Sequence, residues 1–261
     1  MCYNTRQSRK KKDLQEWANL RASLGEVPDD LELIYFSANG WSHPIMWTIT
    51  QERPDFLSPN MWGIMPAKEK QADYKEYFKN PKTFGGLNSK SEKLFDHFIY
   101  RYAWENQRCL IPVDGFFEPH NTKVKVKGKD FKVPFYFKRK DDDPLFLAGI
   151  YTNTADGRRT FSVLTKEATP LFAEIHNDKR RRPVIIDYGN KDEWLYNGLT
   201  ADEVQAMITD DLFEGELEAY PVTKELYSRT IDPNRPEIID PVHYEQIAIA
   251  YPEKPKTNLF D

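Results

Sequence analysis

Short runs of β-forming residues separated by turn signals fill the middle of the chain, and they constrain its fold more than any other feature. The clearest runs are Cys109 to Phe117, Phe131 to Phe137, Leu145 to Tyr151 and Thr160 to Thr165. Asp156-Gly157 lies between the last two and is typical of a hairpin turn. Further β-type runs are Leu33 to Phe36, Ile45 to Ile49 and Pro183 to Asp187. Strands joined by loops therefore make up most of the predicted structure.

Short helices are predicted around these strands from apolar spacing and from capping signals. The expected helices are Leu14 to Leu24 with a stop at Gly25, Ser89 with Glu92 to about Trp104, Thr169-Pro170 to His176, and Thr200 with Glu203 toward Ile208. No internal repeat or low-complexity linker divides the chain. The order predicts an α+β fold, a single domain over residues 1–250 with a β-rich mixed or antiparallel core of barrel-like sheets flanked by short helices. Residues 251–261 are expected to form a flexible tail.

Composition excludes several classes of protein. The 261 residues carry 37 Lys plus Arg and 41 Asp plus Glu, a net charge of −4, so a polycationic nucleic-acid binder is excluded. No apolar run is long enough for a membrane span, and the two cysteines are too few for a secreted disulfide scaffold, so we expect a cytoplasmic protein. Gly85-Gly86 lacks the spacing of a phosphate-binding loop, and the five scattered histidines predict no metal site. We expect a monomer without cofactors.

Cys2 stands directly after the initiator Met, and its small side chain is of the kind that permits Met1 to be removed. An N-terminal cysteine combines an amine of pKa about 8 with a thiol of pKa about 8.5. Such a 1,2-aminothiol captures an aldehyde first as a Schiff base and then as a thiazolidine ring. By itself this position is most often inert. If Met1 is retained, the amine of Cys2 is not free and the ring cannot form.

Four further segments follow Cys2 in a fixed order. They are Trp62 to Pro66, Asn88 to Glu92, Arg108 to Glu118, and Ile175-His176-Asn177 leading to Arg181-Arg182-Pro183. In this order the chain resembles the SOS response-associated peptidase family, whose motifs are Trp-Gly-x-x-Pro, Asn-x-Arg-x-Glu, Arg-Cys-Leu-x-Pro-x-Asp-Gly-Phe-x-Glu and Ile-His-Asn with Arg-Met-Pro. The resemblance covers roughly the first three quarters of the chain.

The resemblance implies a sensor and shield for abasic sites in single-stranded DNA, which forms a covalent cross-link through its N-terminal cysteine. It implies that Cys2 cross-links, Asn88 orients the amine or the sugar, Glu118 is the acid/base, and His176 assists ring opening. The reaction itself requires acid/base side chains of this kind, because the closed sugar ring exposes its aldehyde only after a proton has been transferred. If the motifs are set aside, the simplest interpretations are structural: Glu118 is a solvated carboxylate at a strand end, His176 caps a helix and Asn88 is a turn residue.

DNA contacts are expected from Trp62, Lys90 and Arg181. Trp62 either stacks on a base or packs in the core. Lys90 replaces the family's Arg and holds a phosphate only as a point charge. Further local basic clusters are Arg6, Arg9 to Lys12, Lys123 to Lys132 and Lys179 to Arg182. Because the net charge is negative, we expect modest, salt-sensitive binding to undamaged single strands, and association with the nucleoid only while DNA is bound.

Two other functions remain open. In the first, the Cys2 thiol attacks an amide while Glu118 or His176 moves protons, as in an N-terminal nucleophile peptidase or amidohydrolase. In the second, the protein is a non-catalytic single-strand binder that uses aromatic residues and lysines, so that Cys2 is dispensable.

Overall fold

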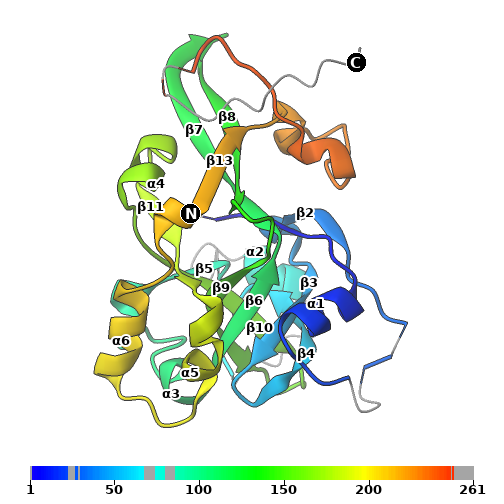
Figure 1. The fold of residues 1–261 in the computed structure, drawn as a ribbon, viewed down its shortest axis with the longest axis vertical. Coiled ribbons are helices and arrows are strands. Elements are labelled where there is room, and N and C mark those ends of the chain that lie inside the picture. Colours follow the sequence, from blue (N-terminus) through cyan, green and yellow to red (C-terminus); the bar gives the residue numbers. More distant parts are fainter. Residues whose placement is uncertain are drawn as a thin grey trace.

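The computed structural model describes residues 2–22, 27–28, 30–67, 74–79, 86–247 and 249, which form two β-sheets with short helices around them (Figure 1). The strands are β1 (Asn4–Gln7), β2 (Tyr35–Asn39), β3 (Ile45–Thr50), β4 (Arg53–Trp62), β5 (Asn88–Lys90), β6 (Arg108–Val113), β7 (Gly115–Val126), β8 (Lys129–Arg139), β9 (Leu145–Asn153), β10 (Arg159–Glu167), β11 (Arg181–Pro183), β12 (Ile185–Ile186) and β13 (Leu217–Pro221). The helices are α1 (Lys11–Trp17), α2 (Tyr74–Lys79), α3 (Ala103–Asn106), α4 (Pro170–Ile175), α5 (Lys191–Leu195) and α6 (Ala201–Thr209). This is the predicted α+β class.

The larger sheet closes on itself. Its strands follow the order β10-β4-β3-β6-β9, and β9 pairs with β10 again, so five strands form a ring. Only the β10–β4 contact in this ring is parallel. β5 and β11 attach to β10, and β12 attaches to β9. The prediction of a β-rich, barrel-like core is confirmed.

Alternating side chains of the ring strands enter two different apolar clusters, as the period of two in a strand requires. On β6, β9 and β10, even-numbered residues such as Leu110 and Phe146 pack against residues of α1, α5 and α6. Odd-numbered residues of the same three strands, such as Ile111 and Leu147, join a second cluster that includes Phe116 of β7 and Cys2. The chain's second residue is therefore part of the protein core.

The smaller sheet has the order β13-β8-β7-β1-β2, and all its pairs are antiparallel. β7 and β8 form a long ribbon that projects away from the ring in Figure 1. β1 lies against β7, with Asn4 opposite Phe117 and Arg6 opposite Gly115. This register brings the N-terminal segment beside the stretch of β7 that contains Glu118.

Predictions based on local signals are mostly confirmed. The Thr200–Glu203 capping box begins α6, with both of its reciprocal hydrogen bonds present. α4 begins at Pro170 after its N-cap Thr169, and its C-cap is His176. β9 and β10 form the antiparallel hairpin predicted at Asp156-Gly157.

The helix predicted from Ser89 to Trp104 is wrong. Residues 88–90 form β5, and the Ser89 hydroxyl donates to Ser162 Oγ at 2.9 Å instead of capping a helix. A short 3-10 turn follows at Ser91–Lys93, and the helix α3 contains only Ala103–Asn106. Pairing with β10 overrides the local capping signal, because it satisfies the backbone of three consecutive residues.

The first predicted helix is shorter than expected. α1 ends at Trp17, and Asn19 adopts a left-handed conformation with φ of 51°. Residues 18–22 are not helical, so the predicted continuation of the helix is wrong there, whereas Leu24, the stop at Gly25 and the tail 251–261 lie outside the described residues. Within the described ranges, no helix combines the length and the apolar character that crossing a bilayer requires.

Candidate active site

Cys2 is fully buried, and its thiol donates to Asn4 O at 3.7 Å. Burial raises the pKa of the Cys2 thiol well above its ordinary value, and the nearby charge of Glu118 raises it further. The thiol is therefore protonated at neutral pH. Cys109 is also free and buried, but it lies within β6.

Asn88 holds the main chain of Cys2. Its side-chain Nδ2 donates to Cys2 O at 2.8 Å, across 86 residues of sequence. β5 is placed for this contact by its parallel pairing with β10, in which Asn88 lies opposite Val163. The other amide atom, Asn88 Oδ1, is buried and has no hydrogen-bond partner among the described residues. Asn88 thus fixes Cys2 with one atom and presents an acceptor with the other.

Glu118 and His176 form a buried pair between two elements. Glu118 comes from β7 and His176 from the end of α4, and Nδ1 of the imidazole lies 3.2 Å from Glu118 Oε2. The same Nδ1 lies 2.9 Å from the main-chain oxygen of Arg181. Because both neighbours of Nδ1 are acceptors, the proton of the neutral ring resides on Nδ1.

Burial lowers the pKa of His176, although the charge of Glu118 partly opposes this effect. The imidazole is therefore neutral at pH 7, with a lone pair on Nε2. Taken together, the site contains a buried thiol, an amide acceptor, a carboxylate and a neutral imidazole. These groups are suited to moving protons around an electrophilic carbon.

The three residues predicted to contact DNA have different surroundings. Lys90 is exposed on β5, two residues after Asn88 and hence on the same face of that strand. Trp62 is fully buried, and its indole donates to Leu87 O at 2.8 Å. The structure thus favours the core interpretation of Trp62 over base stacking.

Arg181 forms a bidentate ion pair with Glu92, with both N–O distances 2.9 Å. A further bond from its Nη2 reaches Thr165 O at 2.6 Å. This arrangement joins two of the sequence motifs, those that contain Glu92 and Arg181. The guanidinium predicted to bind a phosphate is engaged with the protein itself.

Sequence reasoning missed the residues that surround His176. His120, Asn121 and Asn177 hydrogen-bond across β7 and the turn after α4. Asn177 follows His176 in the motif, and His120 lies two residues after Glu118 on the same strand face, so both could have been found from spacing. In the described part of the chain, no three His, Cys, Asp or Glu side chains are grouped as ligands of a metal ion.

The sequence and fold define the class of protein. Residues 1–229 match the family described as SOS response associated peptidase (SRAP), and the chain belongs to this family. It is similar to the abasic site processing protein YoqW of Bacillus subtilis, with 25% identity over 236 residues that cover 85% of this chain and 96% of YoqW. The abasic site processing protein YMR114C of Saccharomyces cerevisiae is 27% identical over 175 residues, which cover 65% of this chain and 44% of the yeast protein.

The fold is also found in a crystal structure of a protein from Bacteroides thetaiotaomicron. The two chains superimpose with a TM-score of 0.79 at 21% identity, covering 93% of this chain and 100% of the other. At this level of identity the similarity concerns the fold alone.

Proposed function

We propose that this protein processes abasic sites by forming a thiazolidine cross-link between Cys2, freed of Met1, and the ring-opened sugar in single-stranded DNA. The observation that carries the proposal is the contact of Asn88 with Cys2 beside the buried Glu118–His176 pair. The names of the relatives as abasic site processing proteins support the same substrate.

The first step opens the sugar ring. A proton leaves the anomeric hydroxyl and another reaches the ring oxygen, which releases the aldehyde. The lone pair on His176 Nε2 accepts the first proton, and the imidazolium then gives a proton to the ring oxygen; Glu118, whose Oε2 lies 3.2 Å from Nδ1, stabilises the imidazolium by its charge. The neutral resting state of His176 supports this role as a base.

The second step joins the protein to the aldehyde. The Cys2 amine adds to the aldehyde carbon, and the carbinolamine loses its hydroxyl as water after protonation by Glu118 or His176. The thiol sulfur then adds to the imine carbon while the thiol proton passes to the imine nitrogen. One water is lost overall and the ring is closed. Because the thiol is protonated at rest, the amine reacts first.

Asn88 and Lys90 orient the partners of this reaction. Asn88 Oδ1 accepts a hydrogen bond from the freed Cys2 amine or from a sugar hydroxyl, because it is a buried acceptor with no partner in the described structure. Lys90, on the same face of β5, supplies a positive charge for a neighbouring phosphate. Arg181 contacts a phosphate only if the DNA displaces Glu92 from the Arg181 guanidinium.

The test is incubation of protein lacking Met1, verified by intact mass, with an abasic single-stranded oligonucleotide, followed by denaturing electrophoresis. We expect a covalent band whose mass is that of protein plus DNA less one water. Cys2→Ala removes the band, while Cys109→Ala, the matched change at the other buried cysteine, retains it. No band with wild type, or a band that survives Cys2→Ala, refutes the proposal.

The family's description as a peptidase keeps amide hydrolysis as a second candidate. The raised pKa of the Cys2 thiol argues against it, because a cysteine nucleophile acts as the thiolate. An acyl-enzyme mass on Cys2 after incubation with peptides, in the absence of DNA, would establish this activity.

A further inference from the structure

The turn that carries His176 is attached to β7 by the residues on both sides of it. On the N-terminal side, Ile175 O lies 2.9 Å from Nδ1 of His120. Glu118 and His120 are two residues apart on β7, so their side chains lie on the same face of this strand. One face of β7 therefore meets both the imidazole of His176 and the backbone just before it.

On the C-terminal side, the Asn177 side chain pairs with both backbone groups of Asn121. Asn177 Nδ2 donates to Asn121 O at 2.9 Å, and Asn121 N donates to Asn177 Oδ1 at 3.0 Å. The pair lies where the regular register of β7 with β8 is interrupted, between Asn121 and Lys125. An amide that makes two bonds to one residue fixes both the distance and the angle of the turn relative to the strand.

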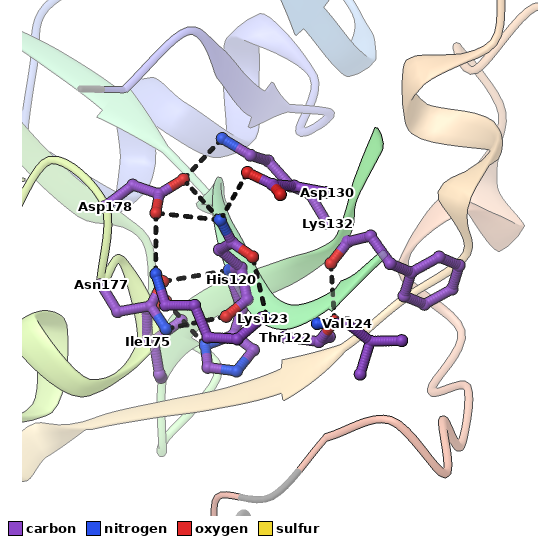
Figure 2. A network of polar contacts seen from close by, with 11 residues as sticks. His120, Thr122, Lys123, Val124, Asp130, Lys132, Ile175, Asn177 and Asp178 are labelled. Carbon is purple, nitrogen blue, oxygen red and sulfur yellow. Dashed lines mark hydrogen bonds and ion pairs between the residues drawn. The ribbon is translucent and has the colours of Figure 1, made fainter. Parts of the chain in front are cut away.

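Asp178 adds a charged attachment beyond this pair, shown in Figure 2. Its carboxylate accepts from Asn121 Nδ2 at 3.0 Å and forms ion pairs with Lys132 at 2.6 Å and Lys123 at 3.1 Å. The bond from Lys132 is the main reason that the pKa of Asp178 lies well below its usual range. Asp178 therefore remains charged throughout the pH range in which His176 titrates.

We propose that Asn177 is a positioning residue that acts through His176, by holding the turn to the Asn121 backbone so that the imidazole meets Glu118. Nothing in this role requires Asn177 to touch DNA. The inference rests on the proposed function, because His176 is the group through which Asn177 acts. A misplacement of about 1 Å at a reacting group reduces rates on the order of a hundredfold, so loosening this turn has a measurable effect.

The first test measures single-turnover cross-linking by Asn177→Ala, with Asn153→Ala as a control at an exposed asparagine on β9. We expect Asn177→Ala to be slower by about tenfold to a hundredfold. Its non-covalent affinity for an oligonucleotide with a tetrahydrofuran abasic analogue remains within about twofold of wild type. The control behaves as wild type.

A double-mutant cycle separates positioning from a general structural role. If Asn177 acts through His176, then Asn177→Ala combined with His176→Gln is no slower than His176→Gln alone. Additive losses, or an equal loss of affinity for the unreactive analogue, overturn the proposal.

A DNA-free measurement decides the proposal even if the wild-type protein forms no cross-link, a result that refutes only the proposed function. In an NMR titration of the histidine side chains, wild-type His176 has a lowered pKa because it is buried. We expect this pKa to move toward the ordinary value in Asn177→Ala, and to move less in Asn121→Ala, which retains the backbone bonds to Asn177. An unchanged His176 titration in Asn177→Ala overturns the proposal.

Discussion

The hydrogen bond from Asn88 to the main chain of Cys2 can be weakened by two substitutions of increasing severity. Asn88→Ala removes the donor and leaves the Cys2 carbonyl without this 2.8 Å partner. Asn88→Asp keeps the shape of the side chain but turns a carboxylate oxygen toward the carbonyl oxygen. Two acceptors then face each other where a donor and an acceptor met, so Asp is the more damaging change.

The size of the effect follows from the cost of an unmade bond. Loss of one partner of a partly buried hydrogen bond costs about 1–3 kcal/mol. If this cost falls on the placement of Cys2, the rate of cross-linking decreases by about 5-fold to 150-fold, since 1.4 kcal/mol is a factor of ten. We expect Asn88→Ala within this range and Asn88→Asp at or beyond its upper end.

Single-turnover cross-linking at saturating protein measures these rates, with removal of Met1 checked by mass for every variant. Ser89→Ala is the matched control, because Ser89 lies on the same strand and bonds away from the site to Ser162. The expected order of rates is wild type and Ser89→Ala, then Asn88→Ala, then Asn88→Asp. Wild-type speed in Asn88→Asp, or an equal loss in Ser89→Ala, refutes the reasoning.

Two more predictions concern pH and stability. Burial lowers the pKa of His176, so the contribution of the neutral imidazole to stability is fully present above pH 6.5 and is lost as the pH falls through the lowered pKa. The melting temperature of the wild-type protein should therefore decrease between about pH 7 and pH 5, and this decrease should be smaller in His176→Gln. The buried guanidinium of Arg182 lies 2.7 Å from the Asp211 carboxylate. Asp211→Ala leaves this guanidinium without that partner and should lower the free energy of unfolding in urea by about 3–5 kcal/mol. Arg182→Met should cost less, because Lys166 still pairs with Asp211 at 2.7 Å. Equal losses in the two variants would contradict this account.

The parts of the fold that were predicted correctly depend on neighbouring residues. The capping box of α6, the proline at the start of α4 and the β9–β10 hairpin are each decided within a few positions. β4 was missed although it spans Arg53–Trp62, because it contains Pro54 and Pro59, which count against a strand. Ser89 was misassigned because its capping signal competes with a partner strand more than seventy residues away.

The ordered motifs of the sequence alone determined the family and the candidate residues Cys2, Asn88, Glu118 and His176, since residue types and their order are written in the chain. Only the tertiary structure decided which of these meet. It placed Asn88 against Cys2, paired Glu118 with His176, engaged Arg181 with Glu92 and buried Trp62. The physical reason is that these contacts join residues brought together by the closure of the β10-β4-β3-β6-β9 ring and by the register of β1 on β7. No local pattern records such long-range pairing.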